Sequence, residues 1–251
     1  MAPELLIDAR YKTVTETISA SIQSKPPLTL VEDPSFVPTD FPILQFQRGA
    51  SEQVNTLLTE HGVPFRPSPL LITSPYNLPN HHLDLNRLDD VQDRVLTLAL
   101  TYLAPIRDDY ATAAYEESLN WDHIRLRIKQ LSRVAEQAWT SRVYYVVIFR
   151  SKLKADHDRQ LLWDLDRESH REAVQSGGLL KYWFGQHDDE VRNLATCVWR
   201  NREDARAGGT GPWHQKARAA GRKLYDRIEF SIWRMTITDD ADSISFGPWS
   251  D

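Results

Sequence analysis

Two histidines in the C-terminal half of this sequence are the side chains best suited to move protons near neutral pH. His170 lies four residues after Asp166 in the stretch DRESHREA, and His214 follows Trp213. Residues four apart share one side of a helix, so we expect Asp166 to hold the His170 imidazole in one tautomer. We therefore expect His170 to act as a general base, with His214 as an acid or hydrogen-bond donor. The alternative, that both are ordinary histidines on partly exposed helix flanks, stays open.

Charged and aromatic side chains in neighbouring apolar segments are candidates for binding a substrate. Lys181 and Arg200 lie in runs that predict strands, where a positive charge needs a partner, a ligand anion or an exit to the rim. We expect one of them to stabilise a developing oxyanion. The aromatic candidates for a pocket wall are Tyr144, Trp183, Trp199 and Trp213. Each residue also fits a structural role, as an ion pair or as core.

Other reaction classes find little support in the sequence. A sole cysteine, Cys197, excludes an intramolecular disulfide and any multi-cysteine metal centre. The groups at 81–84 and 156–158 place histidine and aspartate side by side, which sends their side chains in different directions, so we expect no metal site. The stretch GGTG (208–211) is followed by no Lys-Ser/Thr pair, and no Gly-x-Ser-x-Gly motif occurs.

Composition narrows the class of protein. The 251 residues contain 30 Lys and Arg against 35 Asp and Glu, a net charge of −5, which argues against a general nucleic-acid binder. No run of 18 apolar residues suggests a membrane span, and the first residues do not resemble a signal peptide. We therefore expect a cytoplasmic protein with no nucleic-acid or membrane partner.

The region from residue 141 onward alternates apolar runs with amphipathic stretches. Strands are predicted at VYYVVIFR (143–150), LLKYWFG (179–185), RNLATCVWR (192–200) and EFSIWRMTI (229–237), and helices at 155–178 and 202–228, the second broken at GGTGP (208–212). The order β-α-β-β-α-β predicts an α+β, ferredoxin-like domain with a four-stranded antiparallel sheet and helices on one face. Both sides of these strands are apolar, so we expect homodimerisation to cover the open face.

The region before residue 141 differs in character. Apolar spacing predicts helices at 3–22, 87–117 and 119–138, with Pro105 interrupting the second. Prolines crowd into residues 22–82, which predicts short strands and irregular coil. We expect residues 1–140 to form a helical and proline-rich extension packed on the domain of residues 141–251.

Two stretches carry a family resemblance. SHREAVQSGGLLKYWFG (169–185) and RNLATCVWRNREDARAGGTGPWHQKARAA (192–220) resemble an uncharacterised fungal protein family with a C-terminal dimeric α+β barrel domain of the antibiotic-biosynthesis monooxygenase-like type. The resemblance implies a barrel built from the sheets of two subunits, with a cavity between sheet and helices in each. Members of this superfamily include cofactor-free oxygenases, isomerases, decarboxylases, cyclases, haem enzymes and stress proteins, so the fold alone assigns no reaction.

The residues and the resemblance together favour a small-molecule enzyme. We expect an aromatic or polyketide-like metabolite, of the kind found in secondary metabolism, and cofactor-independent proton transfer by a cyclase, isomerase, lyase or monooxygenase. One alternative is a non-catalytic ligand-binding or stress-response dimer. Another is a haem enzyme with His170 or His214 as the proximal ligand.

Overall fold

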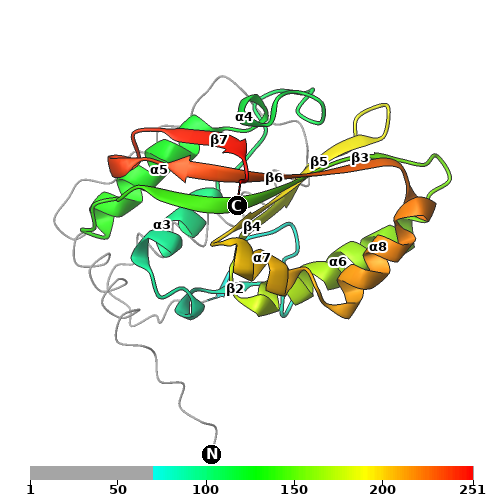
Figure 1. Ribbon diagram of the computed structural model, residues 1–251, viewed down its shortest axis with the longest axis horizontal. Helices are drawn as coiled ribbons and strands as arrows, with labels where there is room; N and C mark the ends of the chain where they lie inside the picture. Colours follow the sequence, from blue (N-terminus) through cyan, green and yellow to red (C-terminus); the bar gives the residue numbers. More distant parts are fainter. Residues whose placement is uncertain (1–69, 251) are drawn as a thin grey trace, which may run out of the picture.

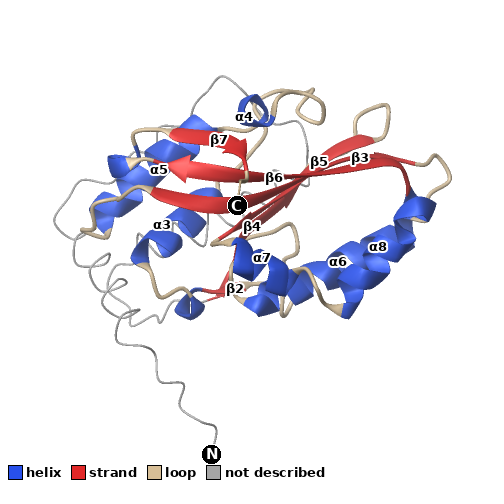
Figure 2. Ribbon diagram, in the orientation of Figure 1, coloured by secondary structure: helices blue, strands red, loops and turns tan. Residues whose placement is uncertain are grey.

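The computed structural model describes residues 70–250, and its centre is an antiparallel sheet of five strands. The order across the sheet is β4-β5-β3-β6-β7 (Figures 1 and 2). The strands are β3 (Arg142–Leu153), β4 (Leu179–Phe184), β5 (Arg192–Trp199), β6 (Tyr225–Ile237) and β7 (Ile244–Pro248). The order of the first four confirms the predicted ferredoxin-like α+β fold. The prediction of four strands was wrong, because β7 adds a fifth at the edge of β6.

Local sequence signals set the helices that join these strands. Helix α6 (Arg159–Ser176) begins after Asp158, whose carboxylate accepts a hydrogen bond from the backbone of Leu161. It ends at Gly177, which takes the left-handed conformation at φ 93°. The predicted broken helix is confirmed as α7 (Arg202–Gly208) and α8 (Pro212–Leu224). Helix α8 ends earlier than expected because β6 already begins at Tyr225.

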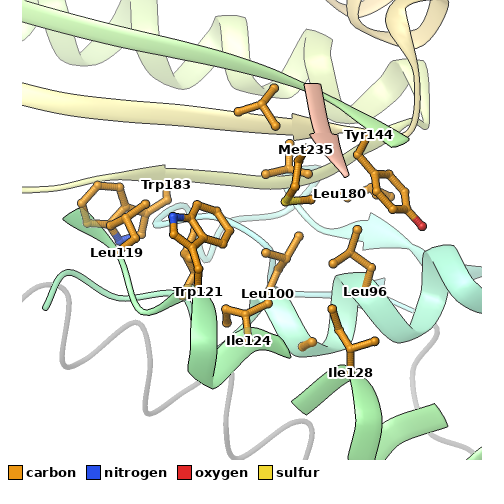
Figure 3. Close-up of a cluster of buried hydrophobic side chains, with 14 of the residues drawn as sticks. Leu96, Leu100, Leu119, Trp121, Ile124, Ile128, Tyr144, Leu180, Trp183 and Met235 are labelled. Carbon is orange, nitrogen blue, oxygen red and sulfur yellow. The ribbon is translucent and has the colours of Figure 1, made fainter. Parts of the chain in front are cut away.

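One face of the sheet is covered by helices that precede the sheet strands in the chain. These are α3 (Val91–Leu100), α4 (Tyr115–Ser118) and α5 (Trp121–Val134). The buried α5 side chains Trp121, Ile124 and Ile128 recur every three or four residues, so one side of the helix is apolar. Figure 3 shows them meeting Leu96 and Leu100 of α3 beneath the sheet residues Tyr144, Leu180, Trp183 and Met235. We call this side of the sheet the α3 face.

The opposite side, which we call the α6 face, carries the alternate strand residues. Tyr145, Tyr182 and Trp199 pack there with Ala173 and Val174 of α6. Helices therefore lie on both faces, and the expectation of helices on one face only was wrong. Helices α3 and α5 cover the sheet face that was expected to be open, so that face requires no second subunit to cover it. The homodimer itself stays a prediction.

Residues 72–87 run alongside β4 and α6, and we call them the crossing segment. The Thr73 carbonyl accepts a hydrogen bond from the backbone of Tyr182 in β4. Arg87 donates to the carbonyls of Gln175 and Ser176 at the end of α6. The segment includes β2 (Leu83–Asp84), which pairs with β1 (Leu70–Leu71), and the 3-10 helix η1 (Leu85–Arg87). A second 3-10 helix, η2 (Asp239–Ala241), joins β6 to β7.

Other expectations for the region before residue 141 have different outcomes. The helix predicted at 119–138 is confirmed as α5, and that at 87–117 is reduced to α3 and α4 with turns between them. The helix predicted at 3–22 and most of the proline-rich stretch lie outside the described residues. None of the helices within residues 70–250 is long and apolar enough to cross a membrane.

Candidate active site

A half-buried aspartate on α6 is the centre of the candidate site. The Asp166 carboxylate accepts hydrogen bonds from the hydroxyls of Tyr76 and Tyr182, the second at 2.7 Å. Tyr76 comes from the crossing segment and Tyr182 from β4, so three separate parts of the chain meet at one carboxylate. We call these three residues the Asp166 cluster.

Burial decides the electrostatics of the Asp166 cluster. Burial raises the pKa of Asp166, against the hydrogen bonds from Tyr76 and Tyr182 that favour the charged form. Burial, together with the nearby Asp166 charge, also raises the pKa values of both tyrosines, so their hydroxyls remain donors. The cluster thus holds a carboxyl group that is easier to protonate than an exposed aspartate, beside two hydroxyls that keep their protons.

Two further groups lie within electrostatic range of Asp166. Burial and the Asp166 charge raise the pKa of Tyr225 to about 12, and the same two causes raise the pKa of the Cys197 thiol. Cys197 and its neighbours Ala195 and Val147 on the α6 face keep part of their surface exposed to solvent. Helices α6 and α8 therefore do not seal this face of the sheet around the Asp166 cluster.

His170 occupies the next turn of α6 and does not pair with Asp166 as expected. Its Nδ1 lies 2.8 Å from Nδ1 of His81, and the two rings are parallel within 3°. The His170 side chain packs against the rings of Tyr76 and Tyr182, with centroids 5.2 and 5.4 Å away. Burial lowers the pKa of His170 well below its usual value, so the imidazole is neutral.

The position of His170 limits what its ring can do. The residue is 4% exposed, and Nε2 is buried without a hydrogen-bond partner among the described residues. Neither ring nitrogen is therefore presented to a molecule bound outside the core. This does not fit the expected role as a general base that touches substrate, nor that of a haem-iron ligand.

His214 lies at the start of α8 and is held by Glu172 of α6. One Glu172 oxygen lies 2.9 Å from Nδ1 of His214, and the carboxylate also accepts the backbone N–H groups of Trp213 and His214. Burial raises the pKa of Glu172, but these hydrogen bonds outweigh it and the pKa falls below the usual value. The arrangement fastens the start of α8 to α6 and leaves His214 with a carboxylate partner.

Three of the expected substrate-binding residues lie on the α3 face, away from the Asp166 cluster. The Tyr144 hydroxyl donates to Asp93 of α3 at 3.0 Å, and Trp183 is 1% exposed. Lys181 is fully buried, which lowers its pKa well below the usual value. It shares this face because it lies two residues before Trp183 in β4, opposite Val198 of β5.

The remaining predicted residues lie on the α6 side or at its rim. Trp199 is buried on the α6 face, and Arg200 forms an ion pair with Asp204 at 2.6 Å. Trp213 is half-buried, with the Lys216 ammonium 3.9 Å from its ring centroid. The structure thus brings Asp166, His170 and Trp199 to one face and leaves Arg200 paired at the end of β5.

Four residues around the site had no expected catalytic role: Tyr76, Tyr182, His81 and Glu172. Tyr76 and His81 lie in a stretch without periodicity, and they reach α6 across separations of 90 and 89 residues. The stretch gives no signal by which either could have been found. Tyr182 lies in a predicted strand, but its role depends on whether its side chain lies on the side of the sheet that packs against α6. Within residues 70–250, no three His, Cys, Asp or Glu side chains are placed to hold a metal ion.

Comparison with known proteins places the chain in a family. The model of the PB2B2.08-like family matches residues 72–248. The UPF0643 protein PB2B2.08 of Schizosaccharomyces pombe is 35% identical over 182 residues, which are 69% of this chain and 82% of that protein. The chain belongs to the PB2B2.08-like family. Both stretches that carried the family resemblance, 169–185 and 192–220, lie inside the matched range.

Solved structures give more distant matches to this PB2B2.08-like chain. Rv0793 from Mycobacterium tuberculosis has a TM-score of 0.32 and 19% identity, over 36% of this chain and 91% of its own. SnoaB, a cofactor-independent oxygenase from Streptomyces nogalater, has a TM-score of 0.32 and 12% identity over the same shares. The assignment of the ferredoxin-like fold rests on the strand order of the chain itself.

Proposed function

We propose that this chain is an enzyme that transfers protons on a small aromatic or polyketide-like molecule, without a cofactor, at the Asp166 carboxylate. The observation that carries the proposal is a half-buried carboxylate with a raised pKa that accepts hydrogen bonds from two tyrosine hydroxyls. Perturbed carboxylates of this kind concentrate at sites of acid–base chemistry. The partly exposed sheet residues around the cluster give a ligand a route to it.

The chemistry follows from the three groups. The Asp166 carboxylate takes a proton from an acidic C–H beside a carbonyl, and the C–H electron pair moves into the enolate. Once Asp166 is protonated it needs fewer donors, so one tyrosine hydroxyl becomes available to donate to the enolate oxygen. Return of the proton from Asp166 to another carbon completes an isomerisation. In a cyclisation, the enolate carbon attacks a second carbonyl, the C=O electron pair moves onto its oxygen, and that oxygen takes the proton back from Asp166.

The neighbours of the Asp166 cluster take supporting roles in this proposal. His170 packs against both tyrosine rings and acts as a positioning residue. Trp163, which is 45% exposed and has its ring centroid 5.1 Å from that of Tyr76, offers an aromatic surface at the solvent side of the cluster. Lys181 faces the opposite side of the sheet, so we assign oxyanion stabilisation to the tyrosine hydroxyls in its place.

Hydrogen–deuterium exchange tests the proposed reaction directly. NMR in D₂O would follow the loss of the acidic C–H signals of 2-tetralone and related enolisable aromatic ketones, with no cofactor added. We expect the purified protein to accelerate exchange, and Asp166→Asn to slow it by about a hundredfold to ten-thousandfold. Asp164→Asn, on the same helix but at its solvent side, is the matched control and should keep the wild-type rate.

Two results would contradict the proposal. One is full exchange activity in Asp166→Asn, which would place the base elsewhere. The other is binding of these ketones, seen as a change in tryptophan fluorescence, without any acceleration of exchange. That second result would favour the non-catalytic ligand-binding reading.

A further inference from the structure

An exposed apolar patch on β6 and β3 lies on the α6 face, and its Val147 also borders the route that we propose for a ligand. Phe230 is 59% and Ile232 46% exposed. Their cross-strand neighbours on β3 are Phe149 and Val147, and the two phenylalanine rings meet edge to face with centroids 5.0 Å apart. We call these four residues the β6 patch. Phe230 and Ile232 are exposed, whereas Val147 and Phe149 are partly exposed, and contiguous apolar side chains that solvent reaches on neighbouring strands are typical of an interaction surface.

The strand that carries the patch has an open edge. β6 pairs with β3 along nearly its whole length, whereas β7 pairs only with residues 233–237. Figure 1 shows β6 running on past the end of β7 toward α8. Among the described residues, no strand pairs with the outer edge of β6 before residue 232. An apolar strand with an open edge favours association with another strand or sheet.

The sequence of β6 shows which partner fits. Phe230 lies at the centre, with Ile228 and Ile232 two residues away on either side. Asp226 lies four residues before Phe230, at the β-bulge that opens the strand, and Arg234 lies four residues after it. Both charged side chains are exposed, and neither forms an ion pair among the described residues. The row therefore has an apolar centre, a negative end and a positive end.

Such a row is complementary to itself. If a two-fold axis passes through Phe230, the row runs antiparallel to its copy, and isoleucine meets isoleucine on both sides. Asp226 of each copy then faces Arg234 of the other. With a strand rise of about 3.3 Å per residue, Arg234 lies about 13 Å from the axis. An unrelated partner would require no such symmetry in this chain.

We propose that the β6 patch docks a second copy of this chain across a two-fold axis at Phe230. This surface differs from the one expected from the sequence, which α3 and α5 cover. The proposal rests on β6 and β3 alone and is independent of the chemistry assigned to Asp166.

Sedimentation equilibrium of the full chain at micromolar concentration tests the interface. We expect a dimer for the wild type, and for Phe230→Glu a dissociation constant raised by about thirtyfold or more, because the residue lies at the centre of the interface. Leu126→Glu is the matched control: Leu126 on α5 is 46% exposed, and the change introduces the same charge on another surface. Circular dichroism would confirm that both variants fold.

A charge exchange tests the register. Asp226→Arg alone places arginine opposite arginine at both ends of the row, and Arg234→Asp alone does the same with aspartate. Each should weaken the dimer by about threefold to tenfold, and the double variant should regain wild-type affinity.

Any of three results would overturn the proposal. The first is a wild type that is monomeric at micromolar concentration. This result would overturn the proposal even if Phe230→Glu lowered the unfolding temperature, because the patch would then make its contacts within one chain. The second is a dimer unaffected by Phe230→Glu. The third is a double charge variant that dimerises no better than either single one.

Discussion

Replacing Tyr76 by phenylalanine tests whether the crossing segment is part of the Asp166 cluster. The change removes one hydroxyl from a side chain that is 1% exposed and leaves the ring contacts in place. A hydrogen bond to a charged group contributes about 1.5–3 kcal/mol to the free energy of unfolding. For a chain of this size the unfolding temperature should fall by roughly 3–12 °C.

The cost of Tyr76→Phe should depend on pH. The Tyr76 hydroxyl favours the charged form of Asp166, so its loss raises the pKa of that carboxyl further. The free energy of unfolding of the wild type should therefore exceed that of the variant most at pH values above the raised pKa of Asp166, where the carboxyl group is ionised. The difference should shrink to about 0.5–1.5 kcal/mol as pH falls through the raised pKa of Asp166, because the bond then joins two neutral groups.

Urea unfolding of both proteins between pH 4 and pH 8 measures this difference. Tyr110→Phe is the matched control, since the Tyr110 hydroxyl donates to the neutral carbonyl of Gln186 at 2.7 Å. Its cost should be about 0.5–1.5 kcal/mol at every pH. An equal cost for Tyr76→Phe at both ends of the range would show that the hydroxyl does not act on an ionised Asp166, and the reasoning about the cluster would fail.

Three further changes probe the surrounding structure. Ile124→Ala, at a fully buried position of α5, should lower the free energy of unfolding in urea by about 2–5 kcal/mol. A decrease of less than about 1 kcal/mol would mean that α5 does not pack on the sheet. Gly177→Ala should cost about 1–2 kcal/mol because φ is 93°, whereas Gly221→Ala, in open space on α8, should be neutral or stabilising in the same melts. The free energy of unfolding of the wild type should decrease as the pH is lowered past about 6.5, because histidines in the unfolded chain take up protons that the buried His81 and His170 resist. His170→Gln should make this decrease smaller.

The order of strands and helices after residue 141 could be predicted because local chemistry encodes it. Strands buried on both faces need apolar side chains at both parities, and the runs around Val146, Tyr182 and Val198 show this without any knowledge of their partners. The helix boundaries at Gly177 and Asn201 follow from backbone freedom and from a side chain that caps backbone N–H groups, as the structure confirms.

The candidate site could be predicted only in part, because its contacts are not local. Helical spacing placed Asp166 and His170 on one side of α6, but Tyr76 and His81 join them across about ninety residues of chain that carry no periodic pattern. Lys181 directly precedes Tyr182 in β4, so its side chain points to the opposite face of the sheet from the Asp166 cluster. Whether an apolar sheet face meets the helices of its own chain or those of another depends on how the whole chain packs. The sequence therefore determined that both faces of the sheet are apolar, and tertiary structure decided that α3 and α5 cover one of them.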